Sequence, residues 1–363
     1  MKVAELFTGC GGLAYGLCEA GLAPVRMIES NIHANKTLVA NRDAGVRHVK
    51  DWPLKREDVR KIDWRDLRGS VDVVAGGPPC QPFSQAGLAA GKKDSRDMWP
   101  EAIRAVREIE PEAFLFENVR GLMRDTFALY FASIQADLRT ACRAGYEVLH
   151  VMVDAADFGA AQRRHRVIVA GFRKDVVSKV SLPKGTHSRR RLLWDQWVSG
   201  SYWEEHGLVQ PGDDRISPTD ASLVARLRRE AVEPAGLRWR TVRDALKTLG
   251  EPSGLDCHVF QPGARSYKGH TGSDLDQPSK ALKAGMHGVP GGENMIRLPE
   301  GGVRYFTIRE MARLQGLPDG YTFPGSWTES TRQLGNAVPV PLAEAFASWT
   351  MRQLEAARLS LVA

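Results

Sequence analysis

The 363-residue sequence has no uninterrupted hydrophobic run long enough to cross a bilayer. No basic leader or cleavable apolar segment comes before the first apolar stretch, "KVAELF". Because both features are absent, we do not expect a membrane-spanning protein or one with a signal peptide. A cytoplasmic protein without a membrane partner is therefore expected.

Cysteine is scarce, and the five present lack the paired spacing of a zinc site or a disulfide framework. No bound metal is expected, and each cysteine is read as a free thiol. Any one of them could therefore be a nucleophile. They are Cys10, Cys18, Cys80, Cys142 and Cys257.

Internal repeats and long low-complexity tracts are also missing. What is present is ordinary globular usage, with 43% hydrophobic and 26% charged residues. Fifty Lys+Arg stand against 43 Asp+Glu, a formal net charge of +7. This balance suits a polyanionic partner such as nucleic acid but does not require one.

The first half of the chain alternates short apolar runs with helical patterns, which is typical of βαβ units and indicates an α/β fold with a mostly parallel sheet. Strands are predicted at Val3–Phe7, Val25–Glu29, Val71–Ala75, Ala113–Phe116, Glu147–Val153 and Val167–Gly171. Helices are predicted near Leu13–Ala20, Asn31–Asn41, Met98–Ile109 and Phe127–Arg143.

After Gly171 this alternation stops, and residues 186–302 are rich in Gly, Pro, Trp and Arg. We expect residues 1–185 to form one domain and 186–302 a second, smaller one. The segment 303–363 should border the second domain at its start and return to the first domain afterwards.

A glycine-rich turn, "FTGCGG", follows the first predicted strand. Glycines at such a turn let a ligand approach the backbone at the start of a helix. Glu29 ends the second strand, where a carboxylate can accept from both ribose hydroxyls. The glycines by themselves are explained by a plain strand-to-helix turn. With Glu29 in place a nucleoside ligand is favoured, and the G-x-G-G spacing favours an adenosyl ligand over NAD.

Cys80 lies in "GGPPCQPFSQ", directly after an apolar strand. The carboxyl end of a parallel strand is where α/β folds bind ligands, and Pro78 and Pro79 restrict the backbone that presents the thiol. A small buried cysteine, the usual alternative, fits these surroundings poorly. We therefore regard Cys80 as the candidate nucleophile. The following segment, 84–97, is predicted to be a mobile loop.

Two further polar groups stand at predicted strand ends. Glu117 and Asn118 end "FLFEN", where a desolvated carboxyl can hand over a proton, although a helix cap or solvated end is equally compatible. The run 162–166, "QRRHR", precedes a strand. It is either a solvated face or a set of phosphate and base contacts.

Taken together, these motifs resemble the cytosine-C5 DNA methyltransferases of bacterial type. The resemblance covers residues 3–175 and 303–350 in the order of the family's motifs. The matching residues are F-x-G-x-G-G at Phe7–Gly12, P-C-Q at Pro79–Gln81, E-N-V at Glu117–Val119, Q-x-R-x-R at Gln162–Arg166, R-E at Arg309-Glu310 and G-N-x-V at Gly335–Val338.

The resemblance implies a Rossmann-like methyltransferase fold and a reaction on a cytosine flipped out of DNA. Cys80 would attack C6 of the base, and Glu117 would hydrogen-bond N3 and the exocyclic amine. Arg164 would hold the base oxygen, with Arg166 as its structural or phosphate partner. Asn118 would orient the cysteine loop.

It also implies S-adenosyl-L-methionine as cofactor. Asp58 is the implied adenine contact with Asp63 as a rival, Trp99 is either an apolar contact or a core residue, and Ser30 stands where the family often has a tryptophan. The complete implied cofactor site is Phe7, Gly9, Gly11, Gly12, Glu29, Asp58, Val59, Pro79, Trp99 and Asn336.

Residues 186–302 fall where the family keeps its target-recognition domain. Loops near 265–270 and 283–292 would read bases in the major groove, although a packing loop is an equal alternative. The implied partners are double-stranded DNA and a cognate restriction endonuclease, and a monomer is expected. The implied DNA contacts are Ser84, Gln85, Arg96, Gln162, Arg265, Lys268 and His270.

Three other functions remain open on the sequence. An RNA (tRNA) cytosine-5 methyltransferase shares the fold, but the long recognition region favours DNA. A catalytically inactive DNA-binding relative could have lost Cys80, Glu117 or Arg164, and all three are present. A NAD-dependent enzyme is disfavoured by the glycine spacing and the Pro-Cys-Gln stretch.

Overall fold

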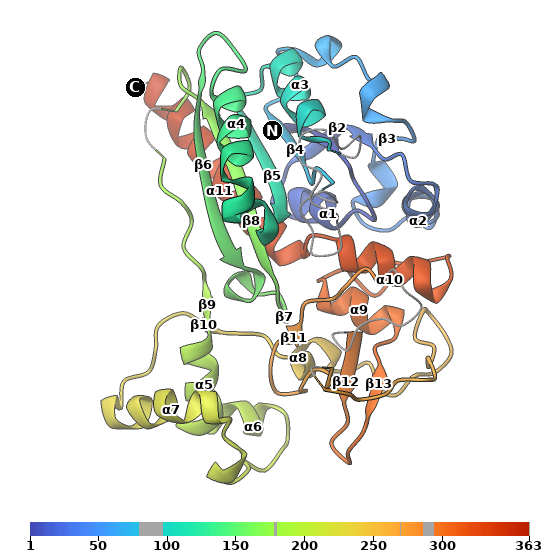
Figure 1. The fold of residues 1–363 in the computed structure, drawn as a ribbon, viewed down its shortest axis with the longest axis vertical. Helices are drawn as coiled ribbons and strands as arrows, with labels where there is room; N and C mark the ends of the chain where they lie inside the picture. Colours follow the sequence, from blue (N-terminus) through green and yellow to red (C-terminus); the bar gives the residue numbers. More distant parts are fainter. Residues whose placement is uncertain (80–96, 178–179, 269, 286–293, 363) are drawn as a thin grey trace.

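A seven-stranded sheet forms the centre of the computed structural model, which describes residues 1–79, 97–177, 180–268, 270–285 and 294–362 (Figure 1). The strand order is β3-β2-β1-β4-β5-β8-β6. The first five strands in this order are parallel, whereas β8 runs antiparallel to both β5 and β6. The strands are β1 Lys2–Leu6, β2 Ala23–Ile28, β3 Leu54–Lys55, β4 Val73–Gly76, β5 Ala113–Val119, β6 Tyr146–Asp154 and β8 His165–Arg173.

Helices cover both faces of this sheet. All four predicted helices are present with shifted ends, and the Asn31 side chain caps α2 by accepting from the backbone of His33 and Ala34. The predicted strands are also present, and the mostly parallel α/β fold is confirmed. The helices are α1 Gly12–Glu19, α2 Ile32–Asp43, α3 Trp99–Ile109, α4 Ala128–Arg139, α5 Arg189–Trp197, α6 Ser201–Glu205, α7 Pro218–Glu230, α8 Val242–Leu246, α9 Ile308–Leu314, α10 Trp327–Asn336 and α11 Val340–Val362.

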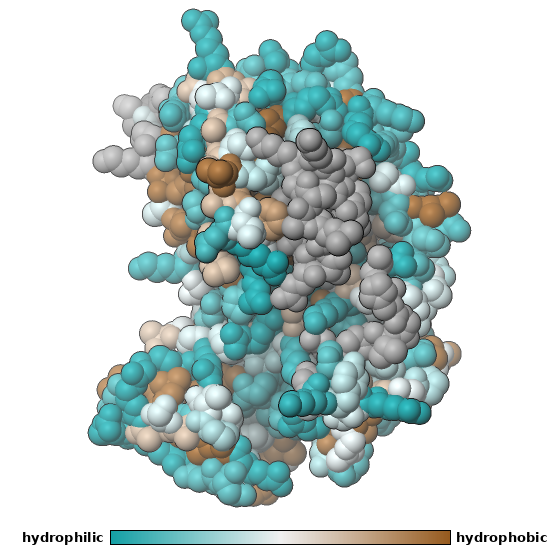
Figure 2. Space-filling model, in the orientation of Figure 1, coloured by the Kyte–Doolittle hydropathy of each residue, from teal (hydrophilic) through white to brown (hydrophobic). Residues whose placement is uncertain are grey.

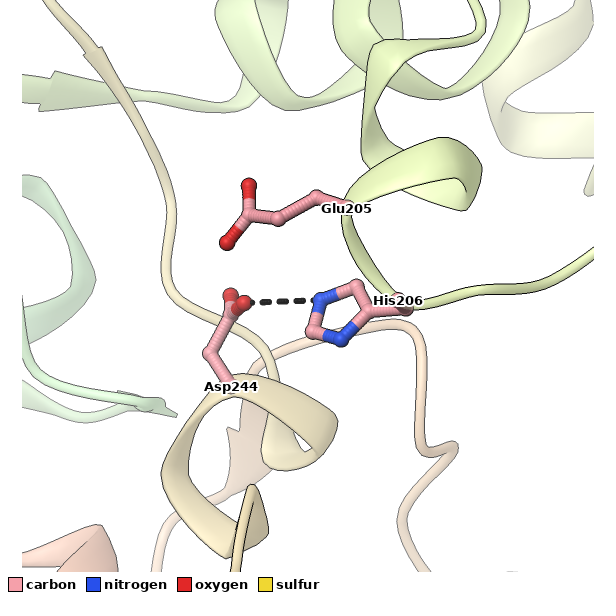
Figure 3. Close-up of side chains that lie close together, drawn as sticks. All are labelled: Glu205, His206 and Asp244. Carbon is pink, nitrogen blue, oxygen red and sulfur yellow. Dashed lines mark hydrogen bonds and ion pairs between the residues drawn. The ribbon is translucent and has the colours of Figure 1, made fainter.

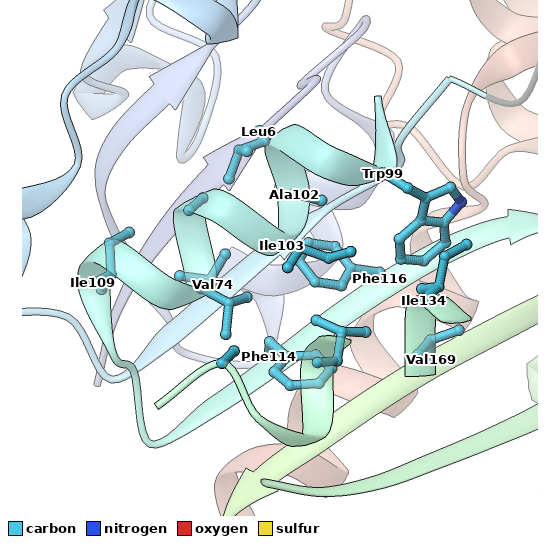
Figure 4. Packing of buried hydrophobic residues seen from close by; sticks show 14 of the residues in the cluster. Leu6, Val74, Trp99, Ala102, Ile103, Ile109, Phe114, Phe116, Ile134 and Val169 are labelled. Carbon is cyan, nitrogen blue, oxygen red and sulfur yellow. The ribbon is translucent and has the colours of Figure 1, made fainter. Parts of the chain in front are cut away.

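The alternation of side chains along a strand explains the two layers. Leu6 and Val74 face α3 and α4, where they pack with Trp99, Phe114 and Phe116 (Figure 4). The opposite face of the same strands packs against α1 and α11. The predicted mobile segment falls almost entirely on residues 80–96, which lie outside the described residues.

The region 186–302 divides between two cores. Helices α5, α6 and α7 bury an aromatic cluster of their own and project as a separate lobe (Figures 1 and 2). The rest, with α8, shares a core with α1, α9 and α10. Short strands complete this part: β7 Gln162–Arg163, β9 His187–Ser188, β10 Leu237–Arg238, β11 Ser279–Lys280, β12 Met295–Arg297 and β13 Val303–Tyr305.

The C-terminal segment starts beside the region 186–302 and then returns to the large sheet. Strand β13 pairs antiparallel with β12, whereas α11 packs on the face of the sheet that α1 covers. Among the described residues, no helix has both the length and the apolar character needed to span a bilayer.

Candidate active site

Glu117 and Arg166 form an ion pair at adjacent positions of the sheet. Glu117 lies near the carboxyl end of β5, and the antiparallel neighbour β8 brings Arg166 opposite Val119. The Arg166 Nε contacts Glu117 Oε1, and Glu117 is only 8% exposed. A buried carboxylate needs a compensating charge, and Arg166 supplies it.

The chain that leads to Cys80 passes beside this pair. Asn118 donates a hydrogen bond from Nδ2 to the carbonyl of Pro78 at 3.1 Å. A Cβ built at Gly77 would lie 3.5 Å from Glu117 Oε2. These contacts support the predicted role of Asn118 in orienting the cysteine loop. Cys80 itself lies outside the described residues, as do three of the predicted DNA contacts, Ser84, Gln85 and Arg96.

Arg164 and Arg166, which have different predicted roles, lie in different surroundings. Arg164 is fully buried and donates from Nη1 to the carbonyl of Leu282 at 2.8 Å and from Nη2 to the carbonyl of Gly335 at 2.6 Å. Its guanidinium therefore joins three segments of backbone. Arg166, and not Arg164, is the arginine beside Glu117.

Gln162, a predicted DNA contact, is enclosed by protein groups in this structure. Its side chain is 0% exposed. The amide donates to the carbonyl of Leu314 at 3.2 Å and to Oε1 of Gln315 at 3.0 Å. A side chain enclosed in this way by protein partners is not available to a nucleic acid.

The carboxylate of Glu29 accepts hydrogen bonds from the backbone of the glycine-rich turn and of the start of α2. One carboxylate oxygen of Glu29 accepts from the amide of Gly9 at 2.7 Å, and the other accepts from the amide of Asn31 at 2.6 Å. Burial raises the pKa of Glu29, and these backbone amides oppose that rise. Each oxygen keeps a lone pair, so the carboxylate can still accept from a pair of vicinal hydroxyls.

The three glycines of the turn have different surroundings. Among the residues that the structure describes, a Cβ at Gly9 would meet only the carbonyl of Phe7, at 4.0 Å. A Cβ at Gly11 would lie 2.7 Å from the Trp52 ring, and one at Gly12 would lie 2.4 Å from the carbonyl of Val338. Packing within the protein therefore accounts for Gly11 and Gly12, while Gly9 faces the space that a ligand could approach.

The predicted adenine contacts are engaged with protein groups. Asp58 caps a short helical turn and pairs with Arg60 at 2.6 Å, and the hydrogen bond from Arg60 lowers the pKa of Asp58. Val59 is buried in the core cluster of α3. Trp99 is fully buried, with its ring edge-to-face on Phe116 at 5.7 Å. This geometry favours the alternative in which Trp99 is a core residue.

The remaining predicted contacts lie toward solvent. Pro79, which follows β4, and Asn336, the last residue of α10, are exposed. Arg265 and Lys268 are exposed as well, and the half-buried His270 lies against the ring of Tyr267 at 4.3 Å between centroids. The exposure of Arg265 and Lys268 and the partial exposure of His270 are compatible with DNA contact.

Sequence reasoning missed Glu5, which lies below the glycine turn. It is 1% exposed, and burial raises the pKa of Glu5 to about 8. The available signal was an acidic residue inside an apolar strand, "KVAELF", because such a residue is costly to bury as an anion.

The basic groups of the α5–α7 lobe are neutralised within it. Arg190 pairs with Glu230 at 2.7 Å, and Arg228 pairs with Asp213 at 2.6 Å. This pairing reduces the positive field of the arginines in this part of the region 186–302.

Glu205, His206 and Asp244 meet between α6 and α8 (Figure 3). His206 lies 2.9 Å from Asp244, and Arg238 contacts Glu205 at 2.9 Å and Asp244 at 2.8 Å. Burial tends to raise the pKa of Asp244, but hydrogen bonds from Thr241 and the charge of Arg238 bring it below its ordinary value. Since Arg238 pairs with both carboxylates and His206 contacts Asp244, the group acts as a polar link between α6 and α8.

The sheet is that of a Rossmann-like methyltransferase fold, with the acidic acceptor Glu29 after β2 and the Glu117–Arg166 pair near the end of β5. The sequence profile of the C-5 cytosine-specific DNA methylases matches residues 1–351. The chain belongs to this family and is a DNA cytosine-C5 methyltransferase.

Its relatives cover nearly the whole chain. The type II methyltransferase M.NgoMIV of Neisseria gonorrhoeae is 32% identical over 355 residues, 97% of this chain and 97% of that protein. M.PspPI of Psychrobacter sp. (strain TA137), also a type II methyltransferase, is 32% identical over 365 residues, 98% of this chain and 80% of that protein.

Among solved structures, the Dnmt2 methyltransferase of S. pombe superimposes with a TM-score of 0.59 at 18% identity, covering 98% of this chain and 99% of that one. The methyltransferase EhMeth of Entamoeba histolytica gives a TM-score of 0.55 at 16% identity, covering 98% and 97%. At these identities the likeness shows the fold.

Proposed function

We propose that this methyltransferase acts on cytosine within one DNA sequence and takes the methyl group from S-adenosyl-L-methionine. The observation that carries the proposal is the Glu117–Arg166 ion pair, beside which Asn118 holds the carbonyl of Pro78 two residues before Cys80. The carboxyl of Glu117 and the guanidinium of Arg166 lie beside the backbone at Pro78, and we infer that Cys80, two residues further on, acts at the same place.

The proposed reaction begins with addition of the Cys80 thiolate to C6 of a flipped cytosine. The electron pair of the C5–C6 double bond shifts to the C4–C5 bond and that of the C4–N3 double bond to N3, so C5 becomes nucleophilic. C5 would then take the methyl carbon as the bond from that carbon to the donor's sulfonium sulfur breaks, with the electron pair left on sulfur. A base then removes the C5 proton, the double bond reforms, and the thiolate leaves.

Glu117 and Arg166 serve the base during this addition. Glu117 hydrogen-bonds N3 and the exocyclic amine of the cytosine, and this contact neutralises charge as the ring loses aromaticity. Arg166 keeps guanidinium donors besides the Nε that meets Glu117, and we assign it the base oxygen. Arg164 takes no part in substrate contact.

The residues present fit an adenosyl ligand with a sulfonium, which supplies an electrophilic methyl group. Glu29 offers acceptor oxygens for the ribose, and the open side of Gly9 gives a ligand access to the backbone. Phe7 lies at the same turn. Asp58, Val59, Pro79 and Asn336 stay predicted contacts, while Trp99 acts by supporting the pocket from the core.

Sequence specificity is assigned to the recognition region, with Arg265, Lys268 and His270 as predicted contacts. The type II methyltransferases to which the chain is similar suggest a cognate restriction endonuclease as its partner in the cell. A monomer remains the expected state because one flipped base needs one site, and a cytoplasmic location remains the expectation.

The test is incubation of the protein with methyl-labelled S-adenosylmethionine and either DNA or RNA of mixed sequence. Label should enter the C5 position of cytosine in DNA, and Cys80→Ser should abolish the transfer. Label in RNA alone would overturn the assigned substrate. Transfer that survives Cys80→Ser would remove Cys80 from the mechanism.

A further inference from the structure

The short segment 282–284 is held to the catalytic sheet by two side chains of the Q-x-R-x-R motif. Strand β11 pairs in parallel with β7, and this pairing brings the segment next to the motif. The amide of Leu282 donates to Oε1 of Gln162 at 3.4 Å, and its carbonyl accepts from Nη1 of Arg164 at 2.8 Å. Both backbone groups of Leu282 are therefore engaged by side chains.

The next residue is held in the same way from another direction. Asn294 is 0% exposed. Its Oδ1 accepts from the amide of Lys283 at 2.9 Å, and its Nδ2 donates to the carbonyl of Lys283 at 2.8 Å. The carbonyl of Asn294 accepts from the amide of Phe306 at 2.9 Å. Asn294 thus links the segment to the strand that leads into α9.

Helix α10 closes the third side. A Cβ at Gly335 would lie 2.3 Å from the amide nitrogen of Ala284 and 2.3 Å from the carbonyl carbon of Lys283. The carbonyl of Gly335 accepts from Nη2 of Arg164 at 2.6 Å. Glycine is required here because backbone lies directly against backbone.

We propose that Asn294, together with Gln162 and Arg164, is a positioning residue for reading the DNA sequence. A peptide segment keeps one position and orientation when its amide and carbonyl are both hydrogen-bonded to buried side chains, because solvent cannot replace those bonds. The segment 282–284 begins the predicted recognition loop 283–292. Since Arg166 follows Arg164 by two residues, the same stretch of backbone carries the arginine that pairs with Glu117.

This inference rests on the proposed function, and it can be tested by a matched pair of variants. Asn41 is also 0% exposed, and its amide makes the same two bonds to the backbone of Thr322, at 2.8 Å and 2.7 Å. Asn294→Asp and Asn41→Asp each turn one donor into an acceptor that faces a carbonyl. Both should lower the melting temperature to a similar degree, but only the first touches the segment 282–284.

Bisulfite sequencing of a random DNA library, methylated to the same extent by each protein, gives the readout. Asn294→Asp should increase methylation outside the wild-type sequence by about tenfold and should raise KM for DNA, because loss of one buried bond frees the segment. The dissociation constant for S-adenosylmethionine, measured by calorimetry, should stay within about twofold. Asn41→Asp should keep the wild-type sequence preference.

Unchanged sequence preference and KM in Asn294→Asp would overturn the inference, as would equal loss of preference in Asn41→Asp. If Asn294→Asp does not fold, Gly335→Ala perturbs the same segment from the other side, and it should relax the preference likewise. A wild-type protein that methylates no DNA would instead refute the proposed function.

Discussion

Glu117 and Arg166 compensate each other's charge in a nearly buried position. The proposed substrate, a flipped cytosine, has to bind beside this ion pair. The planar guanidinium of Arg166 can contact the carboxylate and a base oxygen at the same time, whereas a lysine ammonium cannot reproduce that fork. Arg166 is therefore expected to be sensitive even to a change that keeps its charge.

Arg166→Lys should lower the rate of methyl transfer by about 100-fold, a loss comparable to removal of one preorganised donor from an active site. The matched control is Arg173→Lys at the other end of β8, where the arginine pairs with Asp175 at 2.7 Å. Single-turnover transfer of labelled methyl measures both variants. Equal rates for the two variants would contradict the role given to Arg166.

Glu5 shows the same cost of a buried charge without a compensating arginine. Its pKa is about 8 in the folded protein because of burial, against 4.5 for the ordinary group. Between these two pH values the unfolded chain releases a proton that the folded protein keeps. The free energy of unfolding therefore falls as pH rises from about 4.5 to about 8 and levels off above.

Glu5→Gln should remove this pH-dependent loss, since glutamine has the shape of the protonated acid. The variant should melt close to the wild type at pH 5 and a few degrees higher at pH 8. Thermal unfolding across this pH range, with exposed Glu355→Gln as a control, provides the measurement. A difference that stays constant with pH would show that Glu5 is ionised in the fold.

At the level of secondary structure, the turn between β1 and α1 needs glycine at two positions for two different reasons. Gly9 has a φ of 59°, a region where residues with a side chain are strained, and it faces open space. Gly12 has no such backbone requirement but lies against the segment that starts α11. The motif thus joins a ligand-facing turn to the packing of α1 on the C-terminal segment.

Gly12→Ala should lower the free energy of unfolding by about 1–3 kcal/mol, the usual cost of overpacking, because the new methyl would meet the backbone of Val338. Gly320→Ala is the control, since a Cβ there meets nothing within 4 Å. Urea titration of both variants tests the difference. Equal midpoints would show that the segment at Val338 yields easily.

The periodicity of the sequence predicted the strands and helices of the large sheet because each apolar run is buried on one or both faces. It did not predict the short strand β3, whose two residues carry no pattern, or the antiparallel direction of β8. Which of Arg164 and Arg166 lies beside Glu117 could not be predicted for a similar reason. Two arginines with one residue between them look alike in sequence, and only the register of β8 decides which one reaches Glu117.

At the level of the whole molecule, the formal charge of +7 is a poor guide to where DNA binds. The arginines of the α5–α7 lobe are largely paired with acids of the same lobe. Arg265 and Lys268 lie exposed in the other part of the recognition region. Counterion release should therefore come mainly from that part.

Arg265→Gln should reduce the slope of log affinity for DNA against log salt concentration by about one unit, as expected for the loss of one phosphate contact. Arg190→Gln, which removes a cation already paired with Glu230, should leave the slope nearly unchanged. Fluorescence anisotropy with labelled duplex DNA at several salt concentrations measures both. A larger effect of Arg190→Gln would place the DNA on the α5–α7 lobe.

The central claim, attack of Cys80 on C6 of a DNA cytosine, is tested most directly by duplex DNA with 5-fluorocytosine at the methylated position. After addition and methyl transfer, C5 carries fluorine in place of the proton that must leave, so the enzyme should stay bound to the DNA through a bond that survives denaturing electrophoresis. The complex should require S-adenosylmethionine and should be absent for Cys80→Ser. Normal methylation of ordinary DNA without any trapped complex on the fluorinated duplex would contradict the account.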